Sequence, residues 1–153
     1  EAPQGDDTRQ WGPPFVTRDD DVSAAYFHST NRGKASVVID FKTEAGQVQL
    51  RELIGTADIL IENFKVGGLE KYGLDYLSLK AANPRLVYCS ITGFGAGAGR
   101  DMPGYDLLVQ AMGGLMSVTG PGPGQPTKAG VALARITGTL SNRARITATS
   151  RAL

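Results

Sequence analysis

Two lysines follow apolar segments at points where strands are expected to end. Lys42 comes after residues 36–41, which are rich in β-branched side chains, and Lys65 comes shortly after the apolar run 58–62. Ligands of parallel sheets bind beyond the carboxyl ends of the strands, where an ammonium group can pair with a phosphate. Each lysine could equally be solvated surface, so spacing alone leaves both interpretations open.

A carboxylate, Asp106, stands just after a glycine-rich loop, residues 93–104. The loop has neither the dinucleotide-binding fingerprint nor the phosphate-binding sequence of a P-loop. It is either a flexible connection or a loop that closes over a ligand, with glycine where a side chain would block close approach. Asp106 is accordingly either an acid favoured by a helix dipole or a carboxylate presented to that ligand.

The single cysteine and the single histidine add little chemistry. Cys89 lies within an apolar segment and is expected to be a structural thiol, and His28 has no obvious partner in the sequence. One cysteine and one histidine exclude an internal disulfide and the two-Cys and two-His metal motifs. No metal site is predicted.

The composition is that of an ordinary globular chain. Of 153 residues, 41% are hydrophobic and 20% are charged, and the net charge is +1. No charge imbalance indicates nucleic acid, no apolar run reaches the roughly 18 residues of a membrane span, and residues 1–7 do not resemble a signal peptide. The lack of a disulfide framework suits a cytoplasmic protein. We therefore expect cytoplasmic localisation, without nucleic acid or membrane as a partner.

Strands and helices alternate from residue 36 onward, which predicts an α/β fold with a parallel sheet. Strands are expected at residues 36–41, 58–62 and 86–91, and helices at about 43–55, 68–72 and 75–82 and from Tyr105 onward. Residues 1–34 are expected to be irregular, with a solvated turn at residues 19–21. Trp11 and Phe15 could pin this arm to a core.

Local signals mark where the predicted helices begin and end. Thr43 and Asp75 are suitable N-cap residues. Gly55 and Gly73 can end the preceding helices.

The order of several short motifs resembles the class III CoA-transferases. The matching segments fall within residues 1–134 and include GDDTR (5–9), WGPPF (11–15), NRGK (31–34), ADILIENF (57–64), NPRLVYCSITGFG (83–95), PGYD (103–106) and GGLMS (113–117). The resemblance implies a Rossmann-like parallel sheet, incomplete here, from a fold in which two subunits interlock as a homodimer. It also implies that acyl-CoA and a carboxylic acid are the substrates.

The same resemblance implies which residues hold coenzyme A and which lie beside the thioester. The implied CoA-binding residues are Ile39, Lys42, Asn63, Phe64, Lys71 and Tyr105. Asp106 would be a supporting carboxylate beside the thioester. In the family, an aspartate attacks the thioester to give a mixed anhydride, and CoA then becomes an enzyme thioester before it passes to a second acid.

The residue type at Tyr105 distinguishes two groups of enzymes that this segment resembles, the transferases and the racemases. The related α-methylacyl-CoA racemases place a histidine before the aspartate, for proton transfer at the α-carbon. A tyrosine is poorly suited to that transfer near neutral pH. The sequence therefore favours a transferase over a racemase.

The match fails after Ala134, where the family's nucleophilic aspartate is expected. Arg135, Ile136 and Thr137 follow instead, and residues 135–153 contain four arginines and no acid. We divide the chain into a partial CoA-transferase large domain, residues 1–134, and an atypical basic tail, residues 135–153. The chain also starts just after the family's first strand and helix, so we expect an internal fragment that is inactive alone.

Two hypotheses explain the tail. The coding frame could have slipped near Gly138, because its codons and those that follow, read one base later, can spell the Gly-Leu-Tyr of the family. A second change near Arg135 would then be needed to restore the aspartate. Alternatively, the tail is genuine, and the chain is a divergent member or a non-catalytic CoA-binding or dimerising remnant.

Overall fold

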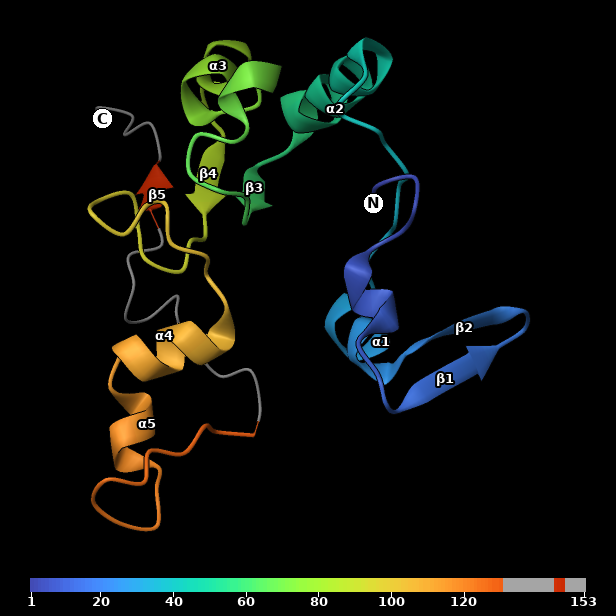
Figure 1. Ribbon diagram of the computed structural model, residues 1–153. Helices are drawn as coiled ribbons and strands as arrows, with labels where there is room; N and C mark the ends of the chain where they lie inside the picture. Colours follow the sequence, from blue (N-terminus) through green and yellow to red (C-terminus); the bar gives the residue numbers. More distant parts are fainter. Residues whose placement is uncertain (131–144, 148–153) are drawn as a thin grey trace. The chain divides into compact units, whose positions relative to one another are not determined.

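The computed structural model describes residues 1–130 and 145–147 (Figure 1). The chain divides into two units, Glu1–Glu52 (unit 1) and Leu53–Leu153 (unit 2). The position expected for the nucleophilic aspartate lies outside the described residues. So does most of the predicted basic tail.

Unit 1 begins with short elements, and the prediction that residues 1–34 are irregular is wrong. The 3-10 helix η1 (Asp7–Gln10) precedes a hairpin of β1 (Phe15–Arg18) and β2 (Asp21–Ala24), and α1 (Ala25–Asn31) follows (Figure 1). All four side chains of β1 are exposed, so this strand lacks the alternation of buried and exposed residues that sequence patterns detect. The predicted turn is confirmed at Asp19, which adopts φ 54°, and at Asp20, whereas Asp21 begins β2.

The expected strand at residues 36–41 is also wrong. Residues 34–40 form no regular element. In this segment, the Ile39 N–H donates to the Glu1 carbonyl at 2.9 Å, and the Val37 carbonyl accepts from the Glu1 ammonium at 2.5 Å. β-Branched residues favour an extended chain, but a strand needs a continuous row of partners. In the described part of the chain, Val37 and Ile39 bond to the backbone of a single residue, Glu1, which does not make a strand.

Helix α2 (Glu44–Thr56) starts as predicted. The Thr43 hydroxyl accepts from the Gly46 N–H at 3.1 Å, which is an N-cap bond. Gly55 lies within the helix and does not end it. The carboxamide of Asn83 donates instead to the carbonyls of Ile54 (3.0 Å) and Ala57 (2.9 Å) at that end.

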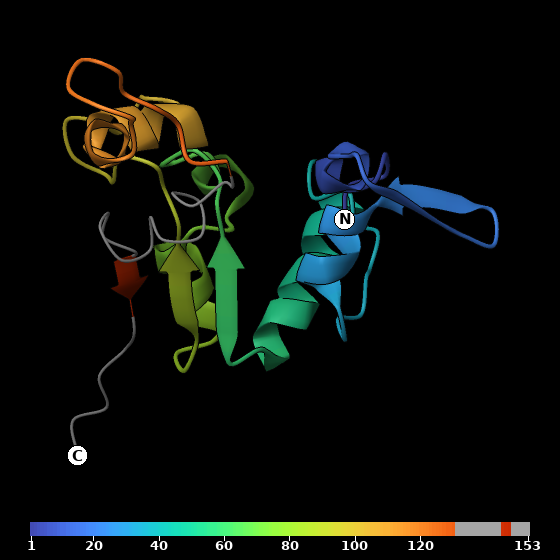
Figure 2. The same ribbon diagram turned by 90° about the horizontal axis from the view of Figure 1, so that it is seen from below.

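The sheet of unit 2 confirms an α/β fold with a small, incomplete parallel sheet. β3 (Ile59–Glu62) and β4 (Val87–Ser90) are parallel, and β5 (Arg145–Thr147) is antiparallel to β4. Figure 2 shows β3 and β4 pointing the same way. The two predicted strands are thus confirmed as neighbours.

The connection from β3 to β4 contains η2 (Glu70–Tyr72) and α3 (Tyr76–Ala82). Gly73 ends η2 with φ 62°, and the Asp75 carboxylate accepts from the N–H groups of Leu77 and Ser78. Both predicted boundary residues are confirmed, because a left-handed glycine and an Asp N-cap act within one helical turn.

The core of unit 2 packs against β4 from this connection. Leu74, Leu79, Leu86 and Tyr88 are buried, and the Tyr88 hydroxyl donates to the Leu74 carbonyl at 3.2 Å. Burial raises the pKa of Tyr88, which keeps its hydroxyl a neutral donor. A short apolar run is typical of a buried parallel strand, but Ile59 and Ile61 of β3 are 61% and 64% exposed.

The last described helices are α4 (Asp106–Met112) and α5 (Leu115–Val118). The predicted helix start near Tyr105 is confirmed, with Tyr105 at the N-cap position. In the described part of the chain, no helix is both long and apolar enough to cross a membrane.

Candidate functional site

The carboxyl ends of β3 and β4 lie side by side at one edge of the unit 2 sheet. Glu62 and Ser90 are partners at the ends of the two strands, and the Ile91 N–H donates to the Glu62 carbonyl at 2.8 Å. The loops that begin at Asn63 and Ile91 therefore leave the sheet together. In both views of the molecule, α4 lies beyond this edge (Figures 1 and 2).

Two glycines close the base of the glycine-rich loop. A Cβ placed on Gly93 would lie 2.4 Å from the Gly104 Cα, and one on Gly104 would lie 3.1 Å from the Gly93 Cα. The first distance is too short for any side chain and the second is tighter than an ordinary contact. The loop therefore returns to its starting point because Gly93 carries no side chain. This closure brings Tyr105 and Asp106 next to the carboxyl end of β4.

The glycine-rich loop is also tied to the loop that follows β3. Lys65 Nζ lies 3.0 Å from Asp101 Oδ1, and both side chains are exposed. The Gly95 N–H donates to the Thr92 hydroxyl at 2.9 Å. An exposed ion pair of this kind contributes little stability, so the glycine contact is the stronger constraint on the loop.

Asp106 is half-buried at the start of α4, and its carboxylate is held by Gln110. Gln110 Nε2 donates to Asp106 Oδ2 at 2.6 Å, and Gln110 Oε1 accepts from the Ala129 N–H at 2.9 Å. Tyr105, the residue before, is 70% exposed. Sequence reasoning missed Gln110; its i, i+4 spacing from Asp106 was the available signal.

The remaining predicted CoA-binding residues fall into two groups. Asn63, Phe64 and Lys71 belong to unit 2 and are exposed; the Lys71 ammonium lies 4.8 Å from the centre of the Tyr72 ring. Ile39 and Lys42 belong to unit 1. The structure thus gathers Asn63, Phe64, Tyr105 and Asp106 on the loops and helix start at one sheet edge, with Lys71 farther along the same connection.

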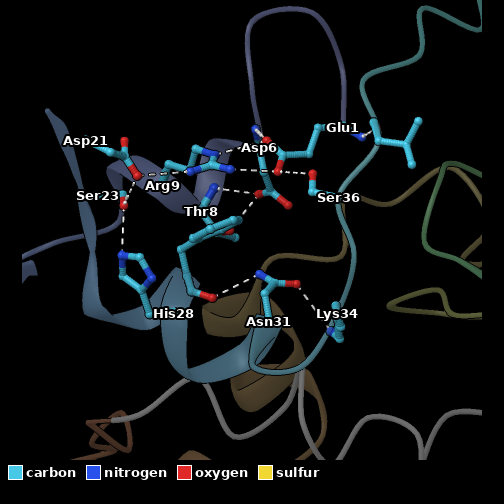
Figure 3. Close-up of polar contacts among 12 residues, drawn as sticks. Glu1, Asp6, Thr8, Arg9, Asp21, Ser23, His28, Asn31, Lys34 and Ser36 are labelled. Atoms are coloured by element: carbon cyan, nitrogen blue, oxygen red, sulfur yellow. Dashed lines mark hydrogen bonds and ion pairs between the residues drawn. The ribbon is translucent and has the colours of Figure 1, made fainter. Parts of the chain in front are cut away.

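A polar network in unit 1 holds the segment that leads to Ile39 and Lys42 (Figure 3). The Glu1 carboxylate pairs with Arg9 through two bonds, from Nε to Oε2 (3.0 Å) and from Nη2 to Oε1 (2.8 Å). Ser36 Oγ also donates to Glu1 Oε1, at 2.6 Å. Hydrogen bonds from Arg9 and then Ser36 lower the pKa of Glu1 to about 2.

His28 has a partner that sequence spacing did not reveal. Its Nε2 lies 2.9 Å from the buried Ser23 hydroxyl, which also donates to Asp21 (Figure 3). Cys89 is half-buried. Residues 1–130 and 145–147 contain no group of three His, Cys, Asp or Glu side chains that could hold a metal ion.

A cavity of about 290 Å³ lies beside the Glu1–Arg9 pair. Its lining residues are Glu1, Asp6, Arg9, Phe27, Asn31, Lys34, Ala35, Ser36 and Val37. Carboxylates and cations share this lining, so its charge does not select one kind of ligand. Neither Ile39 nor Lys42 is among the lining residues.

Comparison with known proteins places this geometry in a family. The model of CoA-transferase family III matches residues 1–152. The chain is 61% identical over 135 residues to a succinate–glutarate CoA-transferase of Agrobacterium fabrum, covering 86% of this chain and 34% of that protein. It is 42% identical to the mouse succinyl-CoA:glutarate CoA-transferase, covering 84% of this chain and 29% of that protein.

Solved structures agree with this assignment. A CaiB/BaiF family protein from Brucella suis superimposes with a TM-score of 0.84 and 57% identity, over 88% of this chain and 36% of that one. A hypothetical protein from Mycobacterium tuberculosis gives 0.75 and 36%, with the same two shares. The chain therefore spans about a third of the length of the relatives it matches. Over that third, the chain belongs to CoA-transferase family III.

Proposed function

We propose that the intact protein is an acyl-CoA:carboxylate CoA-transferase that acts on short dicarboxylic acids such as succinate and glutarate. The observation that carries this proposal is the 61% identity to the succinate–glutarate CoA-transferase of Agrobacterium fabrum. The mouse and human relatives, at 42% and 41% identity, also carry succinyl-CoA and glutarate in their names.

In this proposal, the chain supplies much of the CoA site. Residues Ile39, Lys42, Asn63, Phe64 and Lys71 contact coenzyme A, and the two ammonium groups pair with its phosphates. Tyr105 and Asp106 lie beside the thioester. The shared edge of β3 and β4 supports the part of this assignment that lies in unit 2, since ligands of parallel sheets bind beyond the carboxyl ends of the strands.

The proposed reaction is covalent and needs a carboxylate nucleophile. An aspartate oxygen bonds to the acyl carbon, the carbon–sulfur bond breaks, and the CoA thiolate leaves. The thiolate then attacks the aspartyl carbonyl of the anhydride and releases the first acid, and the second acid takes CoA by the reverse steps. No carboxylate occurs among residues 135–153, so this chain is proposed to bind CoA without transferring it.

The division of the chain at Ala134 belongs to the same proposal. Residues 1–134 are part of the large domain, and residues 135–153 are a basic tail that reads out of frame. Sequencing the encoding DNA from before Arg135 to well beyond Leu153 tests this. A shifted frame that spells Gly-Leu-Tyr and a long family-like continuation is expected, and its absence in every frame would show the tail to be genuine.

We further propose a cytoplasmic homodimer for the intact protein, with acyl-CoA and a carboxylic acid as its partners and no resident metal. The experiment that tests the function follows transfer of CoA from succinyl-CoA to isotope-labelled glutarate. The product of the restored frame, with an aspartate after Ala134, is expected to form labelled glutaryl-CoA, and the present chain is expected only to bind CoA. Binding by both proteins with transfer by neither would favour the CoA-binding remnant.

A further inference from the structure

We infer that Gln110 is a positioning residue, which holds the Asp106 carboxylate and the backbone at Ala129 in one fixed arrangement. The inference rests on the proposed function, because that function places Asp106 beside the thioester. It concerns a residue outside the predicted CoA site and outside the covalent chemistry.

Gln110 is 1% exposed, and both ends of its carboxamide are bonded. The nitrogen donates to Asp106 Oδ2 at 2.6 Å, and the oxygen accepts from the Ala129 N–H at 2.9 Å. Glutamine is seldom buried completely, and an apolar side chain could fill the same space. The two hydrogen bonds are therefore the feature that distinguishes Gln110 from an ordinary core residue.

The two bonds join segments that are separate in the sequence. Asp106 and Gln110 lie one helical turn apart on α4, whereas Ala129 lies 19 residues beyond Gln110. The bond to Oδ2 restricts the rotation of the Asp106 carboxylate. The bond from the Ala129 N–H fixes the backbone at that residue. One buried amide thus sets the position of a proposed site carboxylate relative to the backbone at Ala129.

Hydrogen exchange in the full 153-residue chain tests the coupling. Gln110→Met keeps a side chain of similar length and removes both polar ends. Exchange at the Ala129 N–H is expected to accelerate at least about tenfold, because this N–H loses its hydrogen bond while the region around it stays folded. Exchange at Val87 and Ile91, whose N–H groups bond Asp58 and Glu62, should not change. Unchanged exchange at Ala129 in this variant would overturn the inference.

Gln110→Glu separates the two bonds. The introduced carboxylate can still accept from Ala129 but cannot donate to Asp106 near neutral pH, and it repels that carboxylate. The ¹³C resonance of the Asp106 carboxyl is expected to move from its parent position at neutral pH, where the introduced group is ionised and cannot donate. Ala129 should stay protected. A resonance that does not move contradicts positioning of Asp106 by a donor.

Gln110→Met could lose protection at Val87 and Ile91, which would mean that the variant unfolds. In that case Gln110→Glu alone tests the role of Gln110. A CoA titration of the parent chain, run in parallel, keeps the two proposals apart. Absence of CoA-induced shifts at Asn63, Phe64 and Tyr105 contradicts the proposed CoA site. If exchange at the Ala129 N–H and the Asp106 carboxyl resonance both stay as in the parent, the role of Gln110 is contradicted, whatever the CoA titration shows.

Discussion

Gly93 and Gly104 meet at the base of the glycine-rich loop, so closely that a Cβ on Gly93 would overlap the Gly104 α-carbon. This contact joins the carboxyl end of β4 to the start of α4. It therefore determines where Tyr105 and Asp106 lie relative to the sheet edge. Among the ten other residues of the loop, Gly97 has no atom within 4 Å of the Cβ it could carry.

Substituting Gly93 by alanine should open the loop and destabilise unit 2. The added Cβ would lie 2.4 Å from the Gly104 Cα, and overpacking of this kind costs about 1–3 kcal/mol of unfolding free energy. Gly97→Ala is the matched control and should change stability by less than about 0.5 kcal/mol. Urea unfolding measures both. Equal losses in the two variants would mean that the glycine contact does not close the loop.

Removing the carboxamide of Asn83 should destabilise the end of α2. The Asn83→Ala variant removes the donor that both carbonyls share, and the Ile54 carbonyl keeps only its bond from the Ala57 N–H. The loss should cost about 1–2 kcal/mol. Asn83→Asp keeps an oxygen that can accept from the Arg85 N–H, now at 3.2 Å, but it cannot donate. We expect it to lose at least as much stability in thermal unfolding. A stable Asp variant would show that the acceptor, and not the donor, carries the effect.

The Glu1–Arg9 pair should make unit 1 sensitive to acid. Hydrogen bonds from Arg9 and Ser36 lower the pKa of Glu1 from 4.5 to about 2 in the folded chain. A lowered pKa means that the stabilisation is complete above about pH 4.5 and is lost as the pH falls toward about 2. Glu1→Gln should therefore unfold more easily than the parent at pH 7, with the difference shrinking across this range.

The control for that experiment is Glu52→Gln, which changes an exposed acid of α2 in the same unit. Denaturant unfolding at a series of pH values measures the parent and both variants. A difference between parent and Glu1→Gln that stays constant down to pH about 2 would contradict the assigned pKa.

Removing the charge of Lys71 should weaken CoA binding. A charge-assisted bond to a phosphate contributes about 1.5–3 kcal/mol, so Lys71→Gln should lower the affinity by roughly tenfold or more. The lost affinity should be largest at low ionic strength. Lys80→Gln is the matched control, because Lys80 also lies over a neighbouring tyrosine ring but is not a predicted CoA contact. Calorimetric titration with CoA measures the affinity of both variants. An equal loss of affinity in both would indicate a general effect of lost positive charge.

The sequence alone determined the features whose causes lie within one or two helical turns. Thr43 and Asp75 cap their helices as predicted, and Gly73 ends η2, because cap bonds and left-handed glycines depend on neighbouring residues. The strands β3 and β4 were found because each is a short apolar run bounded by turn residues. The order of the motifs was also enough to predict the CoA-transferase family, which the family match over residues 1–152 confirms.

Only the tertiary structure decided the features that depend on distant partners. Residues 36–41 have the composition of a strand, yet Val37 and Ile39 bond to the backbone of the single residue Glu1 and not to a second strand among the described residues. The partners of Gln110 and the closure of Gly93 on Gly104 likewise join positions far apart in the chain. Composition and periodicity report the preference of a segment for its own conformation, whereas a partner is chosen by the folded chain as a whole.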